Sequence, residues 1–121
     1  MANQNESVKG SEPVAVANGT SEAEFVESGW SHYSQKEYFR AESDFKKALD
    51  INPNNVDTQY ALAMTLMASA RQQEAVQAFE KVMRMLQNAE GTDFVRAHML
   101  SRLAQGHINR IQTGDWGIFK Y

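Results

Sequence analysis

The stretch of residues 38–53 returns 34 residues later in the chain, and this internal repeat constrains the fold more than any other feature. Ala41 recurs as Ala75, and Phe45 recurs as Phe79. A self-match at a period of this length is typical of stacked supersecondary units rather than of one conventional core. We therefore expect a chain of similar units that pack on their neighbours.

The repeated stretch has the spacing of a helix. Its apolar residues recur at steps of four, three and one, which places them on one helical face: Ala41, Phe45, Ala48 and Leu49. Asn52 and Pro53 end the pattern, because the residue before a proline avoids helical geometry and proline has no N–H to donate. The spacing predicts a helix over Tyr38–Ile51.

Another helix is expected before the repeated stretch. Residues 1–20 are polar and show no periodicity, which predicts a disordered tail. Ser21 and Glu24 then form a capping-box pattern, in which each side chain meets an unpaired backbone donor at the helix start. Gly29 lies inside this helix at a cost of about 1 kcal/mol relative to alanine. We expect close approach of a neighbouring helix at Gly29 to repay that cost.

The rest of the chain predicts three further helices, each opened by a polar cap or a turn. The third helix is capped by Asn54 or Asn55 and runs to about Ala70. The fourth helix runs from about Gln72 to Leu86. The fifth helix is capped by Thr92 or Asp93 and runs from Phe94 to about Gln112. Asn88–Gly91 is read as the turn before the fifth helix, and Gly114 as its end. The sequence therefore predicts an all-α protein of five helices.

Composition limits the partners and the compartment. The net charge of −3 argues against nucleic acid or an anionic membrane as the main partner, because both require a basic face. The chain has no cysteine, no apolar run of bilayer length and no signal-peptide layout at its beginning. We expect a cytoplasmic protein.

Catalysis finds little support in the sequence. His32, His98 and His107 lack the spacing of metal ligands, and no glycine pattern is suited to cradling a phosphate. The serine and threonine residues fall in caps and turns, without a nucleophile elbow. We therefore expect a protein with no catalytic residues, metal or cofactor, and not an enzyme.

The 34-residue helix–turn–helix unit, with a small residue in its first helix, resembles a tetratricopeptide repeat. In the first unit the matching residues are Phe25, Gly29, Tyr38, Ala41, Phe45, Ala48 and Pro53. In the second they are Leu62, Ala63, Ala75, Phe79 and, less closely, Val82, and a partial third unit matches over Leu103 and residues 114–116. The pattern has apolar residues where this chain has Ser28 and Gln59, and no proline follows Leu86.

The resemblance implies a right-handed α-solenoid of antiparallel helix pairs, with about two and a half repeats over residues 21–116 and a short tail over residues 117–121. It also implies that the first helix of each unit lines a concave groove that binds an apolar peptide or helix of another protein. The groove positions carried over are Val26, Trp30, Tyr33, Tyr60, Met64, Met67, Ile108 and Ile111, with Ala104 beside them. The expected function is that of a non-catalytic adaptor or scaffold for protein–protein interaction.

Other interpretations of the same residues stay open. A stripe of tyrosine and methionine at helical spacing is often core rather than binding surface. Residues 116–121, the Val14–Val16 patch or a second copy of the chain could cover the groove, the last as a homodimer. The chain could also hold aggregation-prone clients as a small chaperone does, or act as a self-assembling structural unit.

Overall fold

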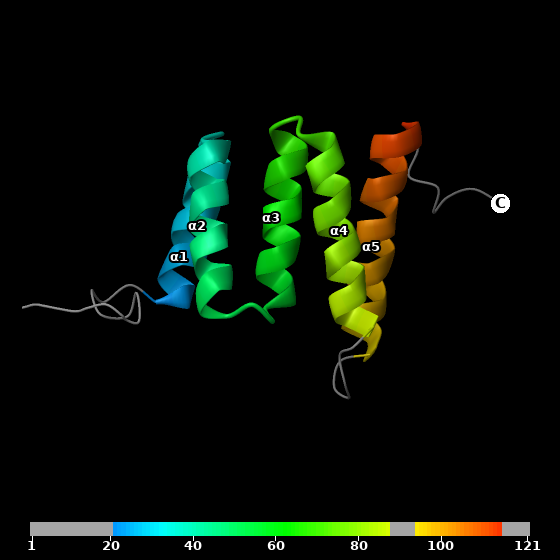
Figure 1. Ribbon diagram of the computed structural model, residues 1–121, viewed down its shortest axis with the longest axis horizontal. Coiled ribbons are helices and arrows are strands. Elements are labelled where there is room, and N and C mark those ends of the chain that lie inside the picture. Colours follow the sequence, from blue (N-terminus) through cyan, green and yellow to red (C-terminus); the bar gives the residue numbers. More distant parts are fainter. Residues whose placement is uncertain (1–20, 88–93, 115–121) are drawn as a thin grey trace, which may run out of the picture. The chain divides into compact units, whose positions relative to one another are not determined.

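The computed structural model describes residues 21–87 and 94–114, which contain five α-helices and no strand. In chain order these are α1 (Glu22–Ser34), α2 (Tyr38–Ile51), α3 (Val56–Ala68), α4 (Gln72–Gln87) and α5 (Phe94–Thr113) (Figure 1). The predicted all-α class is confirmed. The predicted tails, the 88–91 turn and the caps at Thr92 or Asp93 lie outside the described residues.

The chain divides into two compact units between Pro53 and Asn54. Unit 1 holds the helix pair α1–α2, and unit 2 holds α3, α4 and α5. Within unit 2, α3 packs on α4 and α4 packs on α5. The boundary falls where the sequence predicts a helix stop, since α2 ends at Ile51 with Asn52 as its C-cap. Asn55 caps α3, as one of the two predicted alternatives.

The capping box at the start of α1 is present as predicted. The Ser21 hydroxyl accepts a hydrogen bond from the Glu24 N–H at 3.2 Å, and the Glu24 carboxylate accepts one from the Ser21 N–H at 2.8 Å. Two backbone donors that have no partner within the helix are satisfied in this way. α1 also ends through a local feature of the chain. The turn that follows it includes Lys36, whose φ of 64° is not helical.

Gly29 is the point of closest approach between α1 and α2. The glycine is buried, and a Cβ atom added to it would lie 2.6 Å from Cε1 of Phe45. The Phe45 ring is fully buried, at 0% exposure, between Ala41 and Ala48 of the same helix face. The predicted close approach at Gly29 is therefore confirmed, and the aromatic ring fills the space that the missing side chain leaves.

The equivalent residues of unit 2 are also buried, as the repeat predicts. Ala63 takes the place of Gly29 and is fully buried, and Phe79 takes the place of Phe45 and is also at 0% exposure. The third helix of this unit adds Ala104 and Ile108 to the core. α5 ends before Gly114, whose φ of 80° favours glycine, so the predicted end of this helix is confirmed.

The two polar residues that depart from the repeat pattern form hydrogen bonds within their units. The Ser28 hydroxyl donates to Oδ2 of Asp44 at 2.8 Å, which joins α1 to α2. The Gln59 side-chain amide donates to the Ala78 carbonyl at 3.3 Å, which joins α3 to α4. Gln59 is only 3% exposed, and a buried amide without a partner would be costly. These polar residues replace apolar contacts with directional ones.

Candidate protein-binding surface

Unit 1 presents an exposed tryptophan that is held by its neighbours. Trp30 is 42% exposed, yet its ring meets the rings of Phe45 and Tyr33 edge-on, each at 5.2 Å between centroids. Tyr33 in turn meets Tyr38 of α2 edge-on at 5.5 Å. Such aromatic pairs add about 0.5–1.5 kcal/mol beyond the area they bury. Trp30 is therefore oriented by the fold while a large part of its ring faces solvent.

The remaining predicted residues of unit 1 lie on the same helix. Val26 and Tyr33 are half-buried, one turn before and one turn after Trp30. Burial raises the pKa of the Tyr33 phenol, and a charge on Tyr38 would raise it further. The Tyr33 hydroxyl is therefore neutral at physiological pH and is able to donate a hydrogen bond to a partner.

In unit 2 the predicted residue Tyr60 is tied to the third helix of the unit. Its hydroxyl shares a hydrogen bond of 2.9 Å with Nε2 of His107, and its ring meets Phe79 edge-on at 5.6 Å. His107 also stacks on Phe79, with 4.8 Å between ring centroids and 18° between planes. Tyr60 thus makes its ring and hydroxyl contacts within unit 2, and the residue as a whole is half-buried.

His107 is a structural residue that the sequence interpretation missed. It is 8% exposed, and burial followed by the charge of Arg110 lowers its pKa. The imidazole is therefore neutral at physiological pH. A signal was available, because His107 is three residues after Ala104 and one before Ile108, which are apolar residues of the same helix.

The other predicted residues of unit 2 differ in exposure. Met64 and Met67 of α3 are half-buried, so each has some surface exposed to solvent. Ile108 is only 5% exposed and Ala104 is fully buried, which places both side chains in the core of the unit. Ile108 therefore has little surface to offer a partner, although its spacing on α5 resembles that of the groove positions.

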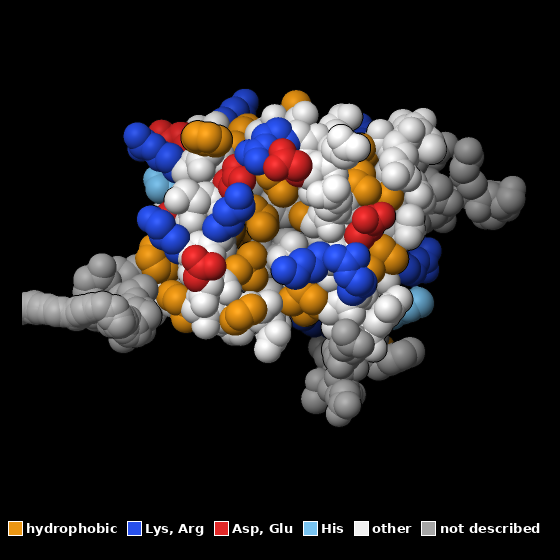
Figure 2. All heavy atoms as spheres, viewed as in Figure 1, with side chains coloured by type: hydrophobic (Ala, Val, Ile, Leu, Met, Phe, Trp, Pro, Cys, Tyr) orange, Lys and Arg blue, Asp and Glu red, His pale blue; other side chains and the backbone are white. Residues whose placement is uncertain are grey.

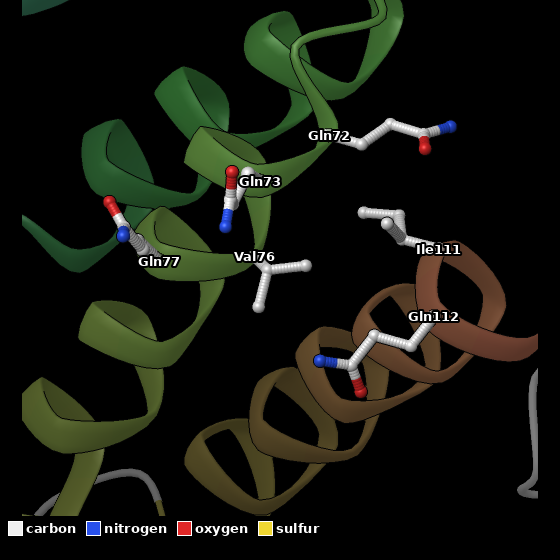
Figure 3. Close-up of a pocket in the computed structure, with 6 residues that line it drawn as sticks. All are labelled: Gln72, Gln73, Val76, Gln77, Ile111 and Gln112. Carbon is white, nitrogen blue, oxygen red and sulfur yellow. The ribbon is translucent and has the colours of Figure 1, made fainter.

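Ile111 lines a cleft of about 400 Å³ between α4 and α5 (Figure 3). Its side chain and that of Val76 point toward each other, and the other residues that line the cleft are glutamines. The lining residues are Gln72, Gln73, Val76, Gln77, Ile111 and Gln112. All six come from α4 and α5, so Ile111 lies at a different place in the unit from the exposed parts of α3.

The imidazole of His32 joins the two helices of unit 1. Its Nδ1 lies 2.7 Å from Oδ2 of Asp44, the same oxygen that accepts the Ser28 hydrogen bond. The serine hydroxyl thus bonds the carboxylate and not the imidazole, which differs from the order that activates a nucleophile. Within the described ranges, residues 21–87 and 94–114, no group of three metal-ligating side chains is found.

Charged side chains of both signs share the visible surface. Figure 2 shows lysine and arginine next to aspartate and glutamate, with hydrophobic side chains between them. In the described part of the chain, no helix has the length and apolar character needed to cross a bilayer.

Helix pairs that repeat at a 34-residue period, with a buried small residue in the first helix and a buried phenylalanine in the second helix of each pair, define a helical-repeat protein. Comparison with known families gives the particular class, since the family model described as tetratricopeptide repeat matches residues 32–100, more than half of the chain. The chain belongs to the tetratricopeptide repeat family. Repeats of this family generally mediate protein–protein interactions and are typically not catalytic. Neither a curated protein nor a solved structure matches the chain in the same comparisons.

Proposed function

We propose that the protein is a non-catalytic adaptor whose first helices bind an apolar peptide or helix of a partner protein. The observation that carries this proposal is Trp30, which is 42% exposed although Phe45 and Tyr33 hold its ring. Tryptophan and tyrosine contribute a large share of binding energy at interfaces. A side chain that is already ordered loses little conformational entropy when a partner covers it.

Each unit has its own proposed contact residues. These residues share a place on a first helix and at least partial exposure: Val26, Trp30 and Tyr33 on α1, and Tyr60, Met64 and Met67 on α3. Methionine adapts to irregular apolar shapes, and it makes favourable contacts with aromatic rings. Ile111 would add an apolar contact at the α4–α5 cleft, whereas the buried Ile108 is not part of the proposed surface.

The partner is proposed to be a protein rather than nucleic acid or a membrane. The net charge of −3 and the apolar character of these residues favour burial of an apolar segment over the neutralisation of phosphates. A cytoplasmic location is part of the same proposal, and it is supported by the absence of cysteine from the sequence.

Affinity capture from native lysate with quantitative mass spectrometry tests the proposal. The bait variant combines Trp30→Ala with Met64→Ala, and the matched control is Phe39→Ala, an 83% exposed aromatic on α2. Loss of a tryptophan anchor costs about 2 kcal/mol, so we expect capture of the partner to fall by about thirtyfold in the variant and to be unchanged in the control. Far-UV circular dichroism of each bait verifies that the helices persist.

A direct measurement follows once a partner is captured. With Trp116 replaced by phenylalanine, emission of Trp30 reports on its own environment and should shift to shorter wavelength when the partner covers the ring. Equal capture by the wild type and the Trp30/Met64 variant would contradict the proposed surface. Capture of many unfolded proteins in place of a defined partner would instead support the chaperone-like alternative.

A further inference from the structure

A stripe of large apolar side chains on α5 is left uncovered. Val95, Met99 and Leu103 are 68%, 58% and 39% exposed, and their spacing of four residues places them along one side of the helix. The opposite side of α5 packs on α4 through Ala104 and Ile108. We call the exposed residues the α5 stripe. Contiguous exposed apolar side chains, rather than singly scattered ones, are typical of interaction sites.

The arginines of α5 give this helix a charge of one sign. α5 spans 20 residues and contains arginines at positions 96, 102 and 110 but no aspartate or glutamate. Arg96 donates to the Asp57 carboxylate, so part of this charge is compensated within unit 2. Arg102 lies next to Leu103 and one turn after Met99, and it is exposed. Among the residues that the structure describes, none forms an ion pair with Arg102, so its charge is available to a partner.

The first helix of the same chain has the complementary character. α1 spans 13 residues and contains three glutamates but no lysine or arginine. Glu24 forms the capping box, and Glu22 accepts a hydrogen bond from Asn52. Glu27 is exposed, with no ion pair to another described residue, and it lies one turn before the exposed Trp30. α1 therefore carries an acidic group beside an apolar anchor, as α5 carries a basic group beside an apolar stripe.

We propose that the protein self-associates head to tail, with α1 of one copy docked on the α5 stripe of the next. Trp30 packs on Met99 and Leu103, and the Glu27 carboxylate faces Arg102. Sulfur–aromatic contact favours this pairing. A symmetric dimer through two α5 helices would oppose arginine to arginine, and one through two α1 helices would oppose glutamate to glutamate, so like charges disfavour both.

The head-to-tail contact has two consequences. Because it joins different faces, each added copy leaves one α1 and one α5 free, and assembly continues with protein concentration unless the rotation closes a ring. Trp30 also belongs to the proposed adaptor surface, so self-association competes with partner binding. The contact itself does not depend on any partner, and its test uses residues outside the adaptor surface.

Charge reversal with complementation tests the contact. The two variants are Glu27→Arg and Arg102→Glu, both at exposed sites in helices, so each is expected to fold. Sedimentation velocity of the wild type should show an average mass that rises with concentration. Each variant alone should associate more weakly by roughly three- to tenfold in apparent Kd, because an attraction becomes a repulsion. An equimolar mixture of the two, and the double variant, should recover association.

The matched control is Arg40→Glu, which makes the same charge change at an exposed position of α2 and should leave association unchanged. Added salt should weaken wild-type association, because exposed charges are screened. A wild type that keeps one monomeric mass at every concentration overturns the proposal. So does a mixture of the two reversed variants that associates no better than either alone, or a dimer that is insensitive to Glu27→Arg.

Discussion

Replacing Gly29 by alanine separates a tertiary effect from a local one. Helix propensity alone predicts that Gly29→Ala stabilises α1 by about 1 kcal/mol. The structure predicts the opposite sign, because the new Cβ would lie 2.6 Å from Cε1 of Phe45 and 2.8 Å from two further ring atoms. Real Cβ atoms do not approach so closely, so the ring or the helix must move.

The size of the expected loss in stability depends on how tightly the Phe45 ring is packed. The ring is at 0% exposure, with Trp30 packed edge-on at 5.2 Å, so it has no solvent side to move toward. Overpacking in a filled core typically costs about 1–3 kcal/mol, and three ring atoms in conflict place this case near the upper end. Subtracting the gain in propensity of about 1 kcal/mol leaves an expected net loss of about 1–2 kcal/mol in unit 1.

Urea unfolding followed by Trp30 emission measures this loss, since that ring reports on unit 1 when Trp116 is replaced by phenylalanine. Ser31→Ala, at an exposed position of α1, is the control and should change stability by less than about 0.5 kcal/mol. Combining Gly29→Ala with Phe45→Leu should cost less than the sum of the single changes, because the smaller side chain relieves the conflict. If Gly29→Ala stabilises unit 1 by the full propensity difference, the close approach is refuted.

Two further predictions concern the caps and the buried histidine. Burial lowers the pKa of His107 in the folded protein. As pH falls below the unfolded pKa of about 6.5, the unfolded chain therefore takes up a proton before the folded protein does. The contribution of neutral His107 to stability is complete above that pH and is lost as pH falls through the folded pKa. Urea unfolding between pH 8 and pH 5 should show this acid sensitivity, and His107→Gln should flatten it; an unchanged pH profile in the variant would exclude this residue as its source. Ser21→Ala should lower the stability of unit 1 by about 1 kcal/mol, because the Glu24 N–H loses its acceptor, and equal midpoints for wild type and variant would show that the cap contributes nothing.

Local signals in the sequence determined the helices and their boundaries. The Tyr38–Ile51 helix has the predicted bounds, and the capping box at Ser21 has both of its hydrogen bonds. Helix hydrogen bonds and the capping box join residues that are at most four positions apart, so a local sequence pattern includes all the residues involved. The sequence also predicted close approach of a neighbouring helix at Gly29, and the structure shows that Phe45 of α2 is the residue that meets it.

The tertiary structure alone decided which apolar residues stay exposed and which polar ones are buried. Leu103 and Ile108 are both apolar residues of the predicted fifth helix, yet one is 39% exposed and the other 5%. The apolar residues of α5 extend around more of the helix than α4 covers, and spacing along a single helix does not say where its neighbour lies. Gln59 and His107 are buried because acceptors, donors and a ring from other helices meet them, and those partners lie 19 and 47 residues away in the chain.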